Sequence, residues 1–279
     1  MKFLARASLA IAIAVALTPA LAADLPTHKD MAAAPTPVSP WGGFYLGGFA
    51  GGSFASAGQA LSLESSYIAT TFPTIIPQID GDGSQQLRGS GVDLGVEAGY
   101  NWNLGQSFVV GVAGDFNWSG LKGARTTDGF LLPAYAPLLP YTLTQQLSND
   151  WRGSLRLRAG VTPLDNLLLY ATGGPALGQF AYKSSFWDRL DPPFYTPANE
   201  TENATLRAIR AGWTLGGGAE WAISRNWSLA GEYLHSEFAS FGGTDAMQLV
   251  QPASTAYVGH STGAIRLDSV RVGLNYHFD

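Results

Sequence analysis

The chain has 279 residues, no cysteine, 34 glycines, 12% aromatic residues and only 13% charged residues, and its formal net charge is −5. The lack of cysteine excludes a disulfide framework, and the acidic balance argues against nucleic acid as a partner. Few charges beside many glycines and aromatic side chains suit a protein whose surroundings are partly lipid.

Residues 1–22 are predicted to form a cleaved secretory signal peptide. Lys2 and Arg6 supply its positive end, residues 9–17 form a short apolar run, and residues 20–22 read Ala-Leu-Ala, which fits the small-x-small cleavage rule. The apolar run is too short for a membrane anchor, which needs roughly 20 residues. Cleavage removes two basic residues, so the mature chain carries 14 basic and 21 acidic residues, a formal charge of −7.

Residues 23–40 are predicted to be a proline- and alanine-rich linker in the periplasm. No periodic pattern is visible in this segment, and four prolines stand among its small residues. Such a composition favours an extended or disordered chain over a packed element.

From Trp41 onward, stretches with a period of two alternate with connectors. Successive side chains of a strand point to opposite faces, so such a stretch has one apolar face and one polar face. Residues 151–161 are the most informative: the parity of Trp151 and Leu157 is apolar, whereas the other parity holds three arginines. Eight strands are predicted, near residues 43–54, 92–102, 108–118, 151–161, 167–182, 209–223, 227–236 and 270–278. The fifth is apolar on both parities, so its faces are not assigned.

Short and long connectors alternate along this part of the chain. The short ones lie near residues 104–106, 162–166 and 224–226, and the long ones near 55–89, 121–149, 183–205 and 240–263. Short turns on one side and long loops on the other are typical of transmembrane β-barrels. Four tryptophans lie close to strand ends, as the aromatic girdles of such barrels do: Trp102, Trp151, Trp221 and Trp227. A soluble β-sandwich is the alternative, but it does not predict this strict alternation.

We therefore predict an all-β protein in the bacterial outer membrane. Residues 41–279 are predicted to form an eight-stranded antiparallel transmembrane β-barrel with short periplasmic turns and four long extracellular loops. No apolar run after the signal is long enough for a membrane helix. Because lipid cannot satisfy loose backbone groups, a closed barrel is the remaining solution for spanning the membrane.

Three segments resemble the Omp25/Omp31-like small outer-membrane proteins of alphaproteobacteria, a porin-family group. They are Trp-Gly-Gly-Phe-Tyr-Leu-Gly-Gly at 41–48, Tyr-Ala-Thr-Gly-Gly at 170–174, and the last strand at 270–278. Ala-Asp-Leu-Pro at 23–26 resembles the mature start of that family. The resemblance implies an abundant, surface-exposed and often immunogenic eight-stranded barrel with no established catalytic residues. Members of this family usually end on an aromatic residue that the barrel-assembly machinery recognises, so Tyr276 and Phe278 are the expected insertion signal, although Asp279 follows them.

The polar parities of the predicted strands carry five acidic and five basic side chains. An eight-stranded barrel is just wide enough for side chains to fill its interior, and an unpaired buried ion costs on the order of several kcal/mol. We therefore predict a salt-bridged plug, with a charge-lined pore as the alternative. The predicted network consists of Asp93, Glu97, Asp115, Arg152, Arg156, Arg158, Arg210, Glu220, Glu232 and Arg271.

The predicted function is structural: envelope integrity and surface display, with outer-membrane lipid, lipopolysaccharide and the barrel-assembly machinery as partners. No hydrolase, zinc or phosphate-loop motif is present, so we expect neither enzymatic activity nor a cofactor. A small passive porin for hydrophilic solutes is the first alternative. The second is a loop-based binder of haem or of a host surface, with Tyr257 and His260 in the last long loop as candidate haem ligands.

Overall fold

The computed structural model of the chain describes residues 40–64, 70, 73–131, 139–188, 201–249 and 254–278. The predicted signal peptide and all of the predicted linker except Pro40 lie outside these described residues. Within the described ranges, no helix has the length and apolar character needed to cross a membrane.

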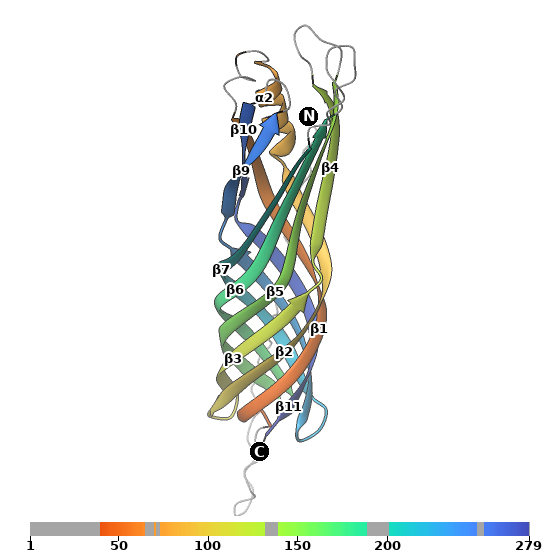
Figure 1. Cartoon of the computed structure of the whole chain (residues 1–279). Coiled ribbons are helices and arrows are strands. Elements are labelled where there is room, and N and C mark those ends of the chain that lie inside the picture. The colour runs from red at the N-terminus through yellow and green to blue at the C-terminus, as the bar shows by residue number, and fades with distance from the viewer. Residues whose placement is uncertain are drawn as a thin grey trace, which may run out of the picture. The chain divides into compact units, whose positions relative to one another are not determined.

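The described residues form eleven strands and the helix α2 (Figure 1). Their bounds are β1 Gly43–Glu64, α2 Ile75–Gly83, β2 Gln86–Leu104, β3 Phe108–Ser119, β4 Lys122–Leu131, β5 Leu139–Leu164, β6 Leu167–Asp188, β7 Thr201–Ala222, β8 Trp227–Phe238, β9 Phe241–Leu249, β10 Ser254–Thr262 and β11 Ile265–His277. The connectors between β2 and β3, β5 and β6, and β7 and β8 are short, and they lie together at the lower end in Figure 1. We call this the short-turn end, and the opposite one the far end.

Antiparallel pairing links eight of the strands in a continuous cycle. From β1 it runs through β2, β3, β5, β6, β7, β8 and β11, and β11 pairs again with β1. The other three strands extend this sheet toward the far end: β4 pairs mainly with β5, and β10 joins the end of β1 to β9. The described residues thus form eleven strands where eight were predicted for the chain.

Much of the sequence predicted as long loops is paired strand or helix. The outward apolar parity of β1 ends at Phe54, but the strand continues to Glu64 with its polarity reversed. Beyond Phe54 the inward residues other than Gln59 are apolar, such as Leu61 and Leu63, and the outward ones are small or polar, such as Ser56. The loop prediction was wrong here because it relied on apolar residues at alternate, outward positions. This pattern ends where the apolar outer surface of the barrel ends.

A bulge in β5 also hid the first half of that strand. The register shifts between Asn149 and Trp151, which leaves Asp150 as an extra residue. Odd-numbered side chains such as Leu143 point inward before the bulge, and even-numbered ones such as Arg156 do so after it. A single parity therefore cannot describe the whole strand.

The outer surface between the two ends is an apolar band bounded by aromatic side chains. Exposed side chains within the band include Val92, Leu94, Leu157, Leu215 and Val272. One aromatic belt lies near the short turns: Phe44, Trp102, Trp221, Trp227, Tyr276 and Phe278. The second belt bounds the band on the far side: Phe54, Trp118, Trp151, Trp213 and Tyr233. Such a band with two girdles is the outer surface of a membrane-embedded barrel.

Strand β6, whose faces the sequence left unassigned, points its even-numbered side chains inward. Leu168, Thr172 and Phe180 are buried, whereas Leu177 on the other parity is half exposed. The strand reads as apolar on both parities because its outward face lies in the band and part of its inward face packs in the apolar interior.

Helix α2 packs into the interior at the far end. Ile75 and Ile79 join a buried cluster with side chains from β1, β5, β6 and β10: Leu61, Leu63, Tyr141, Leu143, Phe186 and Val258. The backbone N–H of Leu63 donates to Asp80 at 2.8 Å, and the hydroxyl of Tyr141 donates to Asp82. Burial and this hydrogen bond raise the pKa of Tyr141 to about 12. The helix therefore fills the far end of the interior with a largely apolar core, in which Gln145 donates a hydrogen bond to the carbonyl of Gly83.

Candidate functional site

The interior at the level of the apolar band is polar and charged, the reverse of the far-end interior. Nine of the ten predicted charged residues lie here, all with little or no exposure. They come from six strands whose inward parity is polar: Asp93 and Glu97 from β2, Asp115 from β3, Arg152, Arg156 and Arg158 from β5, Glu220 from β7, Glu232 from β8, and Arg271 from β11.

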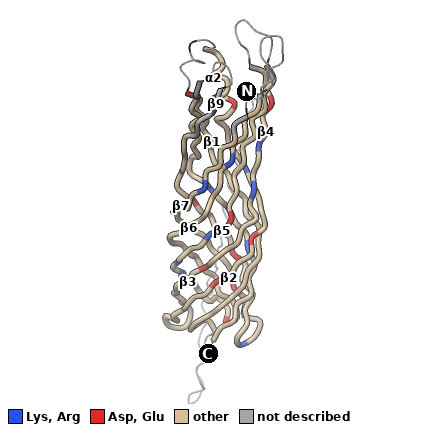
Figure 2. The backbone as a smooth tube through the Cα atoms, viewed as in Figure 1, with Lys and Arg blue, Asp and Glu red and all other residues tan. Residues whose placement is uncertain are grey.

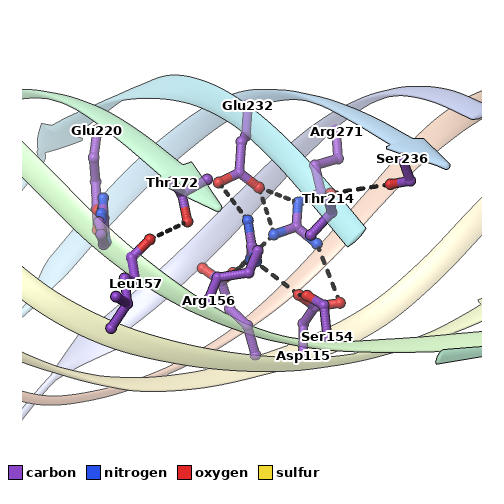
Figure 3. A network of polar contacts seen from close by, with 12 residues as sticks. Asp115, Ser154, Arg156, Leu157, Thr172, Thr214, Glu220, Glu232, Ser236 and Arg271 are labelled. Atoms are coloured by element: carbon purple, nitrogen blue, oxygen red, sulfur yellow. Dashed lines mark hydrogen bonds and ion pairs between the residues drawn. The ribbon is translucent and has the colours of Figure 1, made fainter. Parts of the chain in front are cut away.

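Arg156 lies at the centre of this network, with only 1% of its side chain exposed. Its Nη1 is 2.9 Å from Glu232, and its Nη2 is 3.0 Å from Asp115 (Figure 3). The same Nη2 is 3.5 Å from Glu97. Three strands besides its own thus direct a carboxylate at one guanidinium. The planar guanidinium fork suits such contacts because its five N–H donors spread in one plane.

Arg271 shares the same three carboxylates from the opposite side. Its Nε donates to Glu232 at 2.5 Å, its Nη2 is 3.2 Å from Glu97, and its Nη1 is 3.8 Å from Asp115. Its guanidinium carbon also lies 4.1 Å from the ring centroid of Phe49. Two cations and three anions therefore form one coupled cluster that ties β2, β3, β5, β8 and β11 together across the lumen.

A second cluster lies toward the short-turn end around Glu220, which is fully buried. Arg158 forms an ion pair with this carboxylate, and its guanidinium carbon lies 3.5 Å from the ring centroid of Tyr170. The other oxygen of Glu220 accepts hydrogen bonds from Ser228 at 2.5 Å and Asn275 at 2.9 Å, and it lies 3.1 Å from Nε2 of His277. Each oxygen of the carboxylate is therefore satisfied by neighbouring side chains.

A third group marks the far-end limit of the charged interior. Arg152 and Asp93 are 2.6 Å apart, and Arg152 also donates to Asn149 at 2.7 Å and to Ser119 at 3.3 Å. Beyond it the interior becomes apolar, beginning with Ala55, Leu121 and Leu267. The charged section is therefore closed off from the far end by packed hydrophobic side chains.

Trp41 occupies the short-turn end of the lumen. Only 1% of this residue is exposed, its ring packs with Val109 and Leu168, and its Nε1 donates to the carbonyl of Asp165 at 3.2 Å. Its ring also meets His277 edge-on, with the centroids 6.0 Å apart. The residue that follows the linker thus stops this mouth of the interior.

A small polar cavity lies between the charged side chains toward the far-end limit of the charged section. A cavity of about 30 Å³ lies beside Asp93, Asp115, Asn117, Arg152 and Arg271. That volume holds one or two water molecules, and the cavity is lined by polar groups that can bind them. The arrangement is suited to bracing the barrel from inside.

Comparison with known proteins identifies the family of this charged barrel. A family model described as an outer membrane protein beta-barrel domain matches residues 8–278. The chain belongs to this family of outer-membrane β-barrel proteins. The predicted resemblance and the predicted location in the outer membrane are thereby confirmed.

Two curated relatives of this outer-membrane barrel are each named "31 kDa outer-membrane immunogenic protein", from Brucella melitensis biotype 1 and Brucella suis biovar 1. Each is 31% identical over 283 residues, with the whole of both chains covered. Among solved structures, OprG from Pseudomonas aeruginosa matches 85% of the chain and 97% of its own, with 11% identity and a TM-score of 0.38. A major outer membrane protein from Thermus thermophilus matches 82% and 99%, with 15% identity and a TM-score of 0.36.

The tenth predicted network residue of this outer-membrane barrel, Arg210, lies apart from the other nine. Its guanidinium carbon is 5.3 Å from the ring centroid of Phe241, on β9. Strand β7 carries Arg210 beyond the charged section, opposite Gly178 of β6. The sequence assigned it to the network by parity alone, and parity gives the face of a residue but not its height along the strand.

The two candidate haem ligands do not face one another. Tyr257 and His260 lie on β10, where the sequence predicted a loop, and they are three positions apart, so they point to opposite faces. Tyr257 is 51% exposed, whereas His260 is buried at 2%, with its ring centroid 5.7 Å from that of Tyr182. The strand therefore separates the two side chains, and haem ligation by either residue stays a prediction.

The predicted insertion residues lie in an aromatic cluster at the short-turn end. The ring centroid of Tyr276 is 5.1 Å from that of Trp227 and 4.9 Å from that of Phe278, which in turn is 5.3 Å from Phe44. The backbone N–H of Phe278 donates to the carbonyl of Phe44 at 2.9 Å. The last described residues thus close the cycle against the first residues of β1.

Several polar partners of the charged residues were not predicted from the sequence. Ser154, which donates to Asp115 at 2.5 Å, together with Ser228, Asn275 and His277, lies on the inward parity of its strand beside a predicted charge. The signal was therefore present in the parity. The predicted network contained only charged residues, so these inward polar residues were not included in it.

Proposed function

We propose that this protein is a closed outer-membrane barrel that braces the envelope and displays its far end on the cell surface. In this proposal the eight-strand cycle spans the membrane, the short turns face the periplasm, and β4, β9, β10 and α2 lie outside. The apolar band with its two aromatic belts supports the spanning part, because only a closed sheet satisfies its own backbone groups in lipid.

The observation that carries the proposal is the packed ion network around Arg156. A conducting path along the axis has to separate Arg156 and Arg271 from Glu97, Asp115 and Glu232. Removing one partner of a buried ion pair costs about 3–5 kcal/mol because a charge is left uncompensated. The network is therefore better suited to holding the strands together than to exchanging partners with passing ions.

Both ends of the lumen support the same conclusion. Trp41 fills the short-turn end, and α2 with its buried cluster fills the far end. A solute that entered either mouth would first have to displace a packed apolar group and then break the charged network.

Surface display is supported by the length of strand beyond the aromatic belt. On β1, residues 55–64 continue past the band, which at about 3.3 Å per residue is roughly 30 Å of strand. Their outward side chains are small or polar, including Ser56, Ser62 and Glu64, as for a surface in water. The curated relatives carry the word immunogenic in their name, which agrees with such exposure.

Planar-bilayer recordings test the closed lumen. We expect no stable conductance steps from the purified full-length protein, under conditions where a reconstituted general porin gives clear steps. Large and stable single-channel steps would overturn the proposal and favour the small passive porin.

Orientation is tested separately by labelling intact cells. The chain has no cysteine, so Gln146→Cys on the outward face of β5 and Gln106→Cys in a short turn each introduce a single thiol. A membrane-impermeant maleimide should label Gln146→Cys on intact cells and Gln106→Cys only after lysis. The reverse pattern would contradict the proposed orientation.

A further inference from the structure

Basic side chains gather on the outer surface just beyond the aromatic belt at the far end. Arg88 of β2 and Arg266 of β11 both lie opposite Ser56 of β1, so they flank it on either side. Lys122 of β4 lies opposite Ser90, two residues from Arg88 on β2. All three cations are exposed, and basic residues at this height appear blue in Figure 2. We call Arg88, Lys122 and Arg266 the basic cluster.

The acidic groups near this cluster are already engaged or lie to one side. Glu237 accepts a hydrogen bond from Nε of Arg266 at 3.2 Å. Asp268 accepts one from the hydroxyl of Tyr233 at 2.6 Å, and its carboxylate is 2.8 Å from Nδ1 of His235. Asp150, on the β5 bulge, forms no ion pair with a described cation. The positive charge of Arg88 and Lys122 is not offset by an ion pair with any acidic residue in the described ranges.

An apolar groove lies in the band directly below the cluster, on the same strand as Ser56. Its walls are Leu94 of β2 and Val272 and Leu274 of β11, and its floor is Gly48 and Ala50 of β1. Between Leu46 and Phe54 the outward face of β1 thus carries only the small residues Gly48, Ala50 and Gly52, while both neighbouring strands carry large side chains there.

Backbone packing does not impose this groove. A Cβ atom added to Gly48 or Gly52 would meet its nearest neighbour at 3.8 Å, which is ordinary contact. By contrast, a Cβ on the inward Gly51 would come within 2.3 Å of the carbonyl of Val270. A larger outward residue would therefore fit at Gly48 and Gly52. Folding of the barrel does not require glycine at these two positions.

We propose that the basic cluster and the β1 groove together bind a phosphorylated, multiply acylated glycolipid of the outer leaflet, the lipid A class. The phosphates contact Arg88, Lys122 and Arg266, and one acyl chain lies in the groove. Ser56 and Gly52 are four residues apart, about 13 Å along the strand, which places the charges at headgroup height and the groove at acyl-chain depth. Charge complementarity selects the phosphorylated headgroup, as it does for basic segments at other anionic lipid surfaces.

The distribution of charge favours this leaflet. At the short-turn end, Arg225 is the one basic residue of the three described short turns. The inference rests on the orientation proposed above, in which the far end faces the outer leaflet. A second basic pair, Lys183 of β6 and Arg207 of β7, lies beyond the belt on another side of the barrel, away from the strands that form the β1 groove. This pair is a matched control.

Native mass spectrometry of the detergent-solubilised full-length protein tests the proposal, with bisphosphorylated hexa-acyl lipid A as the probe. Each cation near an anionic lipid contributes roughly fivefold to affinity, so Arg88→Ala, Lys122→Ala and Arg266→Ala combined should weaken binding roughly a hundredfold. The control variant with Lys183→Ala and Arg207→Ala should bind like the wild type. Gly48→Leu with Gly52→Leu should weaken binding roughly tenfold, the effect of about two displaced methylene groups.

Three results would overturn the proposal: wild-type affinity in the triple variant, equal losses in the triple and control variants, or equal affinity for phosphatidylglycerol and lipid A. The last would identify a nonspecific anionic surface. Heat-modifiable migration on gels verifies that each variant is folded. Because binding in detergent does not depend on orientation, cysteine labelling and mass spectrometry fail independently, so an orientation error is distinguished from an absent lipid site.

Discussion

Arg156 of β5 and Glu232 of β8 meet 2.9 Å apart across the lumen, although β6 and β7 separate their strands in the sheet. Their contact is therefore not a cross-strand neighbour pair but a brace through the interior. With Asp115 and Glu97 also directed at Arg156, four strands depend on one side chain. The consequences of removing it are correspondingly large.

Arg156→Ala should lower the free energy of unfolding by about 3–5 kcal/mol, because three carboxylates lose their central buried cation. Urea unfolding in lipid vesicles measures the effect. Arg266→Ala is the matched control, since its pair with Glu237 is exposed and is worth about 0–1 kcal/mol. Equal losses in the two variants would show that the central pair is no more important than a surface pair.

Trp41→Ala should cost about 3–5 kcal/mol, the range for removing a fully buried large aromatic side chain. Trp102→Ala, in the lipid-facing belt near the same end, should cost much less because its side chain is already half exposed. Thermal unfolding of both variants in one detergent compares them. If Trp102→Ala proves the more damaging, Trp41 does not fill the lumen as a packed stopper.

Tyr141 gives the far-end core a dependence on high pH. Because the folded pKa is about 12 and an ordinary tyrosine titrates near 10, the protonated hydroxyl is favoured in the folded state. This stabilisation is complete below pH 10 and is lost as the pH rises from 10 to about 12. Unfolding of the wild type should therefore become easier over this range by more than that of Tyr141→Phe. Parallel pH profiles for the two proteins would contradict the role assigned to the hydrogen bond with Asp82.

The sequence predicted the band-level strands well because lipid imposes one simple rule there. Outward positions such as Val92 and Leu157 must be apolar, and inward ones such as Glu97 and Arg156 are free to be polar, so a period of two is visible. Beyond Phe54 the rule reverses, with Leu61 inward, and the pattern was interpreted as loop. The odd or even position of each charged residue along its strand also predicted that its side chain faces inward.

What parity could not give was height along the barrel axis or contacts across the lumen. Arg210 has the correct face but lies beside Phe241, because pairing register sets its height. Trp41 and α2 fill the two ends of the interior from outside the strands, and their packing depends on partners distant in sequence, such as Leu168 and Phe186. Such contacts leave no periodic signal.

Asp150 supports the final prediction, because this single bulge residue separates two inward parities on β5. Deleting Asp150 joins Asn149 directly to Trp151 and forces one half of the strand to turn its faces over. Either Tyr141 and Leu143 leave the far-end core, or Arg156 and Arg158 turn toward lipid. The deletion should therefore abolish the folded, heat-modifiable form on gels, whereas Asp150→Gly keeps the residue count and should fold normally. A folded deletion variant would mean that the register of β5 is set elsewhere.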